Sequence, residues 1–393
     1  MNNLSPSAAT ASGDIEALRR IVAVEPVWNG IVRIGEVAPS ANRVLFHAGP
    51  KFDNIASVPA PVRNSLAFGC IYEGWAENWQ AADALLDSGA IALRPAQDVG
   101  LLVPLAGVAS PSMAAVRIAD AGTDDARYCV LNEGAEIATR LGLRDDRLLD
   151  HHHWLNEEFA DWLAGCLAYP VAIFPLMLES FTQGDDGHAQ TGAGSRLIAQ
   201  ALRQRAFDVP DRVSAFLDQS AAFALNIWMA TIGLVSGAAA GVAGSSVVVR
   251  AGGNGVSFGY SVASDPHRWI VTKAPALSGT VDPKFGESRP TGALGDSAVL
   301  DFFGLGGLNL HSAPALAAAL ATHLPADYME RAEGLLAGVH PRFGGRAVAS
   351  VATRAAAKGR GPIILLGMID AAGKSGRLGG GVVDTAGHMF VSA

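Results

Sequence analysis

Apolar runs separated by glycine-rich breaks divide the first 150 residues into short predicted strands and helices. Residues 14–21 have the spacing of a short helix, and "RVLFHAGP" (43–50) has the pattern of a strand that ends in a turn. The segment "GWAENWQAADALLDSG" (74–89) predicts an amphipathic helix that stops at its final glycine. "GLLVPLAGV", "MAAVRIAD" and "RYCVLNEG" follow as predicted strands, the last of them opening into a helix at Glu133. Strands that alternate with helices predict a layered α/β domain.

The pattern changes twice in the rest of the chain. Helical spacing with Pro and Gly breaks dominates residues 151–243, and strand-like segments joined by a Gly-Asn-Gly turn return after residue 244. A helix, "APALAAALATHL", and a closing strand with glycines complete this last region. We therefore predict a multidomain fold of class α/β (α+β), with two α/β domains and a mainly helical domain between them. The predicted boundaries are a tail with a short helix (1–22), an α/β domain (23–150), a helical domain (151–243) and a second α/β domain (244–393).

One stretch, between Asp218 and Arg250, contains no charged residue. By length and polarity it fits a membrane span. However, Asn226, several glycines and several Ser/Thr residues interrupt it, and it ends in the β-branched run "SSVVV". A buried helix followed by a core strand is the favoured interpretation, and we expect no membrane association.

Composition and charge narrow the possible functions. The net charge of −8 and the lack of any run of basic residues argue against nucleic-acid binding. The three cysteines, Cys70, Cys129 and Cys166, are odd in number and far apart, which is typical of buried thiols in a reducing compartment. The opening "MNNLSPSAATASGD" lacks the basic and apolar regions of a signal peptide. We expect a cytoplasmic protein.

Two segments imitate well-known ligand sites but do not fit them. In "GPIILLGMIDAAGKSGRLGGG" five residues separate Gly367 from Gly373, one more than a phosphate-binding loop allows. A glycine-rich turn between strands is favoured there, although such a turn can leave N–H groups available to an anion. The "HHH" at 151–153 would point in three directions on a helix, so exposed histidines at a helix start are favoured over a metal site.

Two other segments carry aspartates as candidate functional residues. In "GDDGH", Asp185 and Asp186 beside His188 form either an acid/base group or a helix-capping cluster, and the sequence does not decide between them. Asp296-Ser297 follows a glycine and precedes an apolar stretch, which fits a helix cap or an anion-binding helix start.

Basic residues gather around two of the glycine-rich segments. His47 and Lys51 surround a Gly-Pro turn at a strand end, where α/β sheets usually hold ligands. Arg268, Lys273 and Arg289 add positive charge near the second segment, or belong to ordinary surface ion pairs.

Taken in order, these segments resemble one family, the YlbE-like family, which includes the AllG subunit of oxamate carbamoyltransferase. The resemblance rests on "HAGP", "EGWA", "PLAGVASPSM", "YCVLNEG", "GDDGH", "GSSVVV", "NGVSFG", "GDSAV" and "GRLGGGVV", which together cover residues 25–390. The chain departs from the family pattern at four places: Gln97-Asp98-Val99, Asp186, Gln190-Thr191 and Asp370-Ala371-Ala372. Its N-terminal region is also shorter than that of longer family members.

The resemblance implies an enzyme subunit of ureide and allantoin nitrogen metabolism, part of purine catabolism. Its reaction would move a carbamoyl group between oxalurate, giving oxamate, and phosphate, giving carbamoyl phosphate. It implies an FdrA-like partner related to acyl-CoA synthetases and a further small subunit. We expect a homo-oligomer, no cofactor and no metal.

Carbamoyl transfer needs donors for an oxyanion, a clamp for phosphate and a group that manages the amide proton. We assign proton transfer to His188 oriented by Asp185, with Asp296 and Ser297 at the same cleft. The predicted substrate-binding residues are His47, Lys51, Asn132, Glu133, Arg268 and Lys273. Two alternatives stay open: a non-catalytic subunit that scaffolds a catalytic partner, and a stand-alone amidohydrolase acting on ureide-like or cyclic amides.

Overall fold

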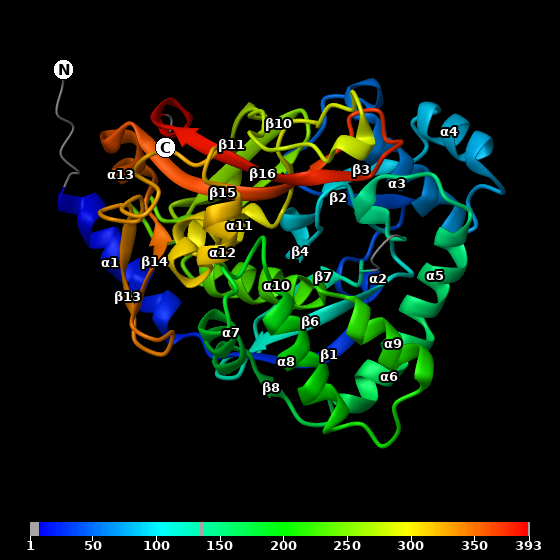
Figure 1. Cartoon of the computed structure of the whole chain (residues 1–393), viewed down its shortest axis with the longest axis horizontal. Helices are drawn as coiled ribbons and strands as arrows, with labels where there is room; N and C mark the ends of the chain where they lie inside the picture. The colour runs from blue at the N-terminus through cyan, green and yellow to red at the C-terminus, as the bar shows by residue number, and fades with distance from the viewer. Residues whose placement is uncertain (1–7, 134–136, 392–393) are drawn as a thin grey trace.

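The computed structural model describes residues 8–133 and 137–391, which form a mixed arrangement of sheets and helices (Figure 1). The helices are α1 (Ala8–Ala23), α2 (Ile34–Val37), α3 (Ala60–Tyr72), α4 (Trp79–Asp87), α5 (Arg147–Asn156), α6 (Glu158–Cys166), α7 (Ile173–Thr182), α8 (Gly192–Arg203), α9 (Asp211–Gln219), α10 (Phe223–Gly237), α11 (Ala298–Phe303), α12 (Pro314–Ala319) and α13 (Ala352–Lys358). The strands are β1 (Pro26–Arg33), β2 (Val44–His47), β3 (Ala92–Pro95), β4 (Leu101–Leu102), β5 (Val108–Ala109), β6 (Ala114–Asp120), β7 (Ala126–Val130), β8 (Val171–Ala172), β9 (Val248–Asn254), β10 (Ser257–Val262), β11 (Asp265–Lys273), β12 (Leu294–Gly295), β13 (Leu336–His340), β14 (Arg346–Ser350), β15 (Arg360–Ile369) and β16 (Arg377–Ala386). The predicted multidomain α+β class is confirmed.

A sheet in the order β4-β7-β6-β1-β8 organises the first half of the described chain. β6 pairs with β7 and with β1 in antiparallel fashion, and β4 pairs with β7 in parallel. Side chains alternate along β6, so that Val116 and Ile118 enter the core beneath α10, whereas Ala115 enters the core beside β2. Because both faces are covered, β6 is apolar except at Arg117 and Asp120.

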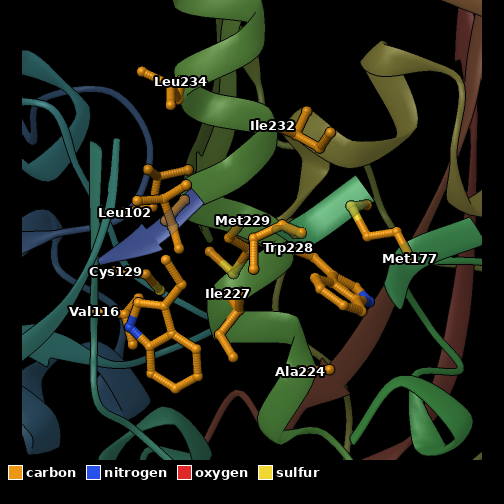
Figure 2. Close-up of a cluster of buried hydrophobic side chains, with 14 of the residues drawn as sticks. Leu102, Val116, Cys129, Met177, Ala224, Ile227, Trp228, Met229, Ile232 and Leu234 are labelled. Atoms are coloured by element: carbon orange, nitrogen blue, oxygen red, sulfur yellow. The ribbon is translucent and has the colours of Figure 1, made fainter. Parts of the chain in front are cut away.

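Helix α10 lies at the centre of the molecule (Figure 1). It packs against β6 and β7 on one side and against α11 and α8 on another. Figure 2 shows Leu102 and Cys129 facing α10 from the sheet side, while Trp228 points toward Met177 of α7. A helix buried on so many sides has no polar face to display, and this explains the lack of charge that its sequence shows.

The uncharged stretch is a buried helix followed by a core strand, as predicted from its sequence. Within residues 8–133 and 137–391, no single helix is both long and apolar enough to cross a membrane. One pair, α9 and α10, meets the length and composition limits together, but the two helices are bent by 72°.

The second half of the chain is built on antiparallel strands. β9, β10 and β11 form a meander that β12 extends beside β9, and β15 and β16 form a long hairpin that crosses the molecule (Figure 1). The predicted Asn-Gly turn is present between β9 and β10, with Gly255 at φ +88°. α11 packs against α10, β9, β14 and β15, so it joins the two halves.

The helical segment shares its core with the first sheet. β8, inside that segment, pairs with β1, and α10 covers β6 and β7. The residue boundaries of the three predicted domains stay a prediction.

Local signals explain why some elements begin or end at other residues than those predicted from the sequence. α4 starts at Trp79, later than predicted, because the Asn78 side chain caps it by accepting from Ala81 N at 2.9 Å. α12 ends at Ala319, and turns follow it. The helix predicted to open at Glu133 falls on residues 134–136, outside the described residues.

The central position of α10 leads to a stability prediction. Trp228 is fully buried, so Trp228→Ala should lower the free energy of unfolding by about 3–5 kcal/mol through lost burial and a new cavity. Phe207 is fully exposed, and Phe207→Ala should change it by less than about 0.5 kcal/mol. Urea denaturation of both variants measures the difference. Equal effects would contradict the central role of this helix.

Candidate functional site

The carboxylate of Asp296 joins three distant parts of the chain. Its Oδ1 accepts hydrogen bonds from Gly49 N at 2.9 Å and from Gln97 Nε2 at 2.6 Å. Its Oδ2 accepts from Val103 N at 2.9 Å. We call Asp296 and these three donors the Asp296 network. The side chain is fully buried, and burial raises the pKa of its carboxyl to about 7, although the three donors and Arg250 act to lower it.

Glycines let these segments approach one another. Gly49 has φ +70°, and a Cβ there would collide with the backbone of Gly253 in β9. A Cβ on Gly252 would lie 2.6 Å from Asp296 Oδ1. Asn254, two residues after Gly252, donates from Nδ2 to Pro50 O at 2.7 Å. The glycine-rich ends of β2 and β9 are therefore held together around the Asp296 carboxylate.

His47 lies at the start of the same loop and is buried. Its Nδ1 donates to Ala48 O at 2.9 Å, whereas its Nε2 has no hydrogen-bond partner among the described residues. Burial lowers the pKa of His47 to about 4, so the ring is neutral at pH 7 and Nε2 carries a lone pair. Gly49, two residues after His47, donates to Asp296, so His47 and Asp296 lie on two segments that meet.

A cavity of about 270 Å³ adjoins the Asp296 network. Gln97, which binds Asp296, also lines this cavity, together with Asp98, Arg127 and Arg250. Asp98 Oδ1 accepts from Arg250 Nη1 at 2.7 Å and from the indole N–H of Trp269 at 2.9 Å. We call this cavity the arginine pocket.

His188 belongs to a second buried cluster. Its Nδ1 lies 2.6 Å from Asp301 Oδ2, and both side chains are almost completely buried. Asp301 Oδ1 also accepts from Gly307 N and Leu365 N, which fixes the carboxylate. Burial acts to lower the pKa of His188, but the charge and hydrogen bond of Asp301 outweigh it and raise that pKa. Asp301 sits on α11, and Asp296 lies five positions earlier, just before this helix, so one short segment carries both clusters.

Of the two aspartates of "GDDGH", Asp185 caps α8 and Asp186 holds the loop before it. Asp185 accepts from Ala193 N at 3.1 Å and Gly194 N at 2.7 Å in the first turn of α8. Asp186 Oδ1 accepts from the backbone N–H groups of His188 and Gln190, both at 2.9 Å. The orienting partner predicted for His188 was Asp185, but the structure places Asp301 there instead.

Sequence reasoning missed Asp301 because its partner is 113 residues away along the chain. The available signal was an acid within the apolar segment "AVLDFFGLGG". A carboxylate buried in such a segment requires a partner.

Asn132 and Glu133 lie close to the loop that contains Val103. Asn132 Nδ2 donates to Thr139 Oγ1 at 2.5 Å, and a Cβ on Gly107 would lie 2.8 Å from the same nitrogen. Glu133 forms a buried ion pair with Arg140 at 2.7 Å. Both residues are buried.

The other predicted binding residues lie at the surface, apart from Ser297. Lys51, Arg268 and Lys273 are exposed, and Arg268 lies 4.0 Å from Asp265. Arg289 donates to Glu287 O at 2.9 Å. Ser297 is buried at the start of α11 without capping it through its side chain. The four basic side chains are not among the residues that line the arginine pocket, whereas Arg127 and Arg250, which the sequence did not single out as ligands, do line it.

The histidine triplet is not the exposed group that the sequence predicted. His151 Nε2 lies 2.7 Å from Glu133 O, and His152 is fully buried with Nε2 accepting from Thr139 N. His153 is exposed beside Glu157. Within the described parts of the chain, no group of three or more His, Cys, Asp or Glu side chains could hold a metal ion.

The glycine-rich turn between β15 and β16 contains its own anion. The carboxylate of Asp370 accepts hydrogen bonds from Ala372 N, Lys374 N and Ser375 N at 2.9–3.2 Å. These N–H groups are therefore not available to a phosphate, and the turn is the structural feature that its spacing predicted.

The fold and these sites define a class of α+β protein whose glycine-rich loops close around a buried carboxylate beside a polar pocket. The family model described as "Oxamate carbamoyltransferase subunit AllG" matches residues 91–297, which is more than half of the chain. The chain belongs to this family, as its sequence motifs predicted. The matched segment contains Gln97, Val103 and Asp296, but not the 46–53 loop.

Individual relatives agree with this assignment. The chain is 27% identical over 315 residues to the oxamate carbamoyltransferase subunit AllG of Escherichia coli K12, which covers 76% of this chain and 73% of that protein. It is 27% identical over 320 residues to the uncharacterized protein YahG of the same organism, covering 78% of this chain and 67% of the relative.

A crystal structure of a conserved protein of unknown function from Enterococcus faecalis V583 superimposes with a TM-score of 0.90. It covers 99% of this chain and 98% of that one at 22% identity. This similarity supports the fold alone.

The raised pKa of Asp296 predicts how stability depends on pH. Between about pH 4 and pH 7 the folded protein keeps a proton that the unfolded chain has released, so this group makes stability fall as the pH rises through that window. Asp296→Asn removes the titration. We expect the loss of unfolding free energy from pH 4 to pH 7 to be smaller in this variant, measured by urea denaturation at both pH values.

An exposed carboxyl is the matched control for this measurement. The pKa of Asp282 is lowered, chiefly by the backbone N–H of Lys284, so Asp282→Asn should retain the wild-type fall. An Asp296→Asn variant that loses as much stability as the wild type would show that the buried carboxyl does not hold the proton.

Proposed function

We propose that this chain is a subunit of a carbamoyltransferase that acts on an oxalurate-like ureide and phosphate. In this reaction the bond between the carbamoyl carbon and the amide nitrogen of oxalurate breaks. A bond from that carbon to a phosphate oxygen forms, and the departing nitrogen takes up a proton to give oxamate. Membership of the AllG family supports this choice of reaction.

The observation that carries the mechanism is the 2.6 Å contact between His188 Nδ1 and Asp301 Oδ2. A buried carboxylate that accepts from one ring nitrogen fixes the tautomer and leaves the other nitrogen for proton transfer. Asp301 is in turn held by backbone N–H groups of Gly307 and Leu365, so the ring has one fixed orientation. We assign proton transfer to His188 and the orienting role to Asp301.

We assign substrate binding to the Asp296 network and its neighbours. His47 Nε2 and the Gln97 amide provide polar atoms at the loops that meet on Asp296. Asn132 and Glu133 lie along the adjoining loop. Lys51, Arg268, Lys273 and Ser297 remain predicted contacts, and the exposed bases among them suit a contact with the partner subunit or the approach of an anion from solvent.

We propose that the partner is an FdrA-like subunit and that activity belongs to the assembled complex. The buried position of His188 fits a site that is completed by a partner or by closure around substrate.

The pH dependence of turnover tests the role of His188. In the assembled complex with oxalurate and phosphate, His188→Gln should lower kcat by about 10²–10⁴-fold. It should also remove the limb of the kcat–pH profile that the titration of His188 produces. Asp301→Asn removes the charge that raises the pKa of His188, so the limb should move to lower pH.

His153→Gln is the matched control, because His153 is exposed on α5 beside Glu157. It should leave both rate and pH profile unchanged. Wild-type turnover in a folded His188→Gln variant would instead assign this chain a scaffolding role. Turnover of oxalurate by the isolated chain without phosphate would favour the amidohydrolase alternative.

A further inference from the structure

The arginine pocket is enclosed by elements from both halves of the chain. It lies between the 3₁₀ turn at Ala96–Val99, the first residues of β7, the glycine face of α10 and the β9 strand. We propose that the arginine pocket binds a small oxyanion, a phosphate or a carboxylate group, between the guanidinium groups of Arg127 and Arg250. This assignment deepens the proposed function, on which it rests for the identity of the anion.

Arg127 is a partly buried cation that forms no ion pair with a carboxylate among the described residues. Its Nη1 donates to Ala126 O at 2.8 Å. Burial is the main cause that lowers the pKa of Arg127, and the positive charge of Arg250 adds to it, whereas the charge of Asp125 acts to raise it. Two cations that repel each other across one cavity gain stability when an anion enters it.

Glycines on α10 make room for the guanidinium. A Cβ on Gly237 would lie 2.9 Å from Arg127 Nη2, and a Cβ on Gly100 would lie 3.3 Å from Arg127 Cδ. Gly233, one turn earlier on α10, leaves space for the Leu102 side chain in the same way. The side chain of Arg127 is thus enclosed between two backbones, which gives its donors a defined direction.

Arg250 is held in place before any ligand arrives. It donates to Asp98 Oδ1 at 2.7 Å and to Ser261 Oγ at 3.0 Å, and its guanidinium lies over the Trp269 ring at 4.7 Å. Its Nε has no partner in the described part of the chain. A fixed guanidinium loses little entropy on binding, and its planar donors match a carboxylate or phosphate.

The charges that line the pocket suit one anion. Arg127 and Arg250 contribute two positive charges and Asp98 one negative charge, so the two arginines and the aspartate together give a net charge of +1. The volume of about 270 Å³ lies below the range of pockets that hold drug-sized ligands. Gln97 connects the pocket to Asp296, so an anion here lies beside the network assigned to substrate binding.

Direct binding measurements on the isolated full-length chain test the proposal. Inorganic phosphate and oxamate are titrated by calorimetry at constant ionic strength, with chloride as the reference anion. We expect saturable binding of at least one of them. Arg127→Gln should weaken it by at least tenfold, because the cation without a carboxylate partner is lost.

The matched control is Arg212→Gln. Arg212 is an exposed arginine that stacks on Trp154 at 4.4 Å and is not among the residues lining the pocket. This variant should bind the anion within twofold of the wild type. Equal binding by Arg127→Gln, or no saturable binding by the wild type, would overturn the proposal.

A second variant fills the pocket without changing its charge. Ala240 lines the arginine pocket, and Ala240→Leu should also weaken binding at least tenfold. This matters because Arg127 also borders a neighbouring cavity of about 340 Å³, which is lined by Arg19 and Arg20 together with Asp120 and Asp125. If Arg127→Gln abolishes binding while Ala240→Leu retains it, the anion occupies that neighbouring cavity and the proposal is wrong.

The assembled complex separates this proposal from the proposed function. Anion binding to the chain without carbamoyl transfer by the complex would reject the function and retain the site. Carbamoyl transfer with an unchanged KM for phosphate and oxalurate in Arg127→Gln would reject the site and retain the function.

Discussion

The constraint on which the rest of the site depends is the burial of the Asp296 carboxylate. Its oxygens can be satisfied inside the protein only if N–H donors are brought to them, and those donors come from the 46–53 loop, Gln97 and Val103. A buried carboxylate without hydrogen-bond partners would cost free energy. Segments that are far apart in the sequence therefore meet at this one place. The glycines at 49 and 252 are the complementary requirement, since side chains there would prevent the approach. The Asp296 carboxylate and the space left by the two glycines together determine how these loops meet.

Helix α11 transmits this arrangement to the His188 cluster. Asp296 precedes its first turn and Asp301 lies within it, so the position of one carboxylate limits the position of the other. The helix packs against α10, β9 and β15, which makes it a rigid connection between the two halves of the chain. The proton transfer that we propose for His188 would benefit from such support, because small displacements of a donor strongly reduce its effectiveness.

Local patterns in the sequence predicted much of the structure, and long-range charge partners explain what they missed. The turn at Gly255, the cap before α8 and the role of "GKS" as a simple turn follow from spacing and glycine content, which act over a few residues. The loop that contains His47 reaches Asp296 through Gly49 N, although the roles predicted for His47 and Asp296 stay a prediction. Asp301 and Arg127 were missed because burial decides their importance, and burial depends on segments more than a hundred residues away. Exposed bases such as Lys273 stand out in a sequence, whereas a half-buried arginine does not.

The turn after β15 illustrates how a protein can resemble a nucleotide-binding loop without acting as one. Asp370 is tethered to the very backbone that it binds, so its local concentration around those N–H groups greatly exceeds that of a dissolved phosphate. An external anion would have to compete against a ligand that never diffuses away. Such a self-occupied turn gains rigidity from the bonds that a nucleotide site reserves for its substrate. A motif search guided by glycine, lysine and serine alone would wrongly assign the chain to the nucleotide-binding enzymes.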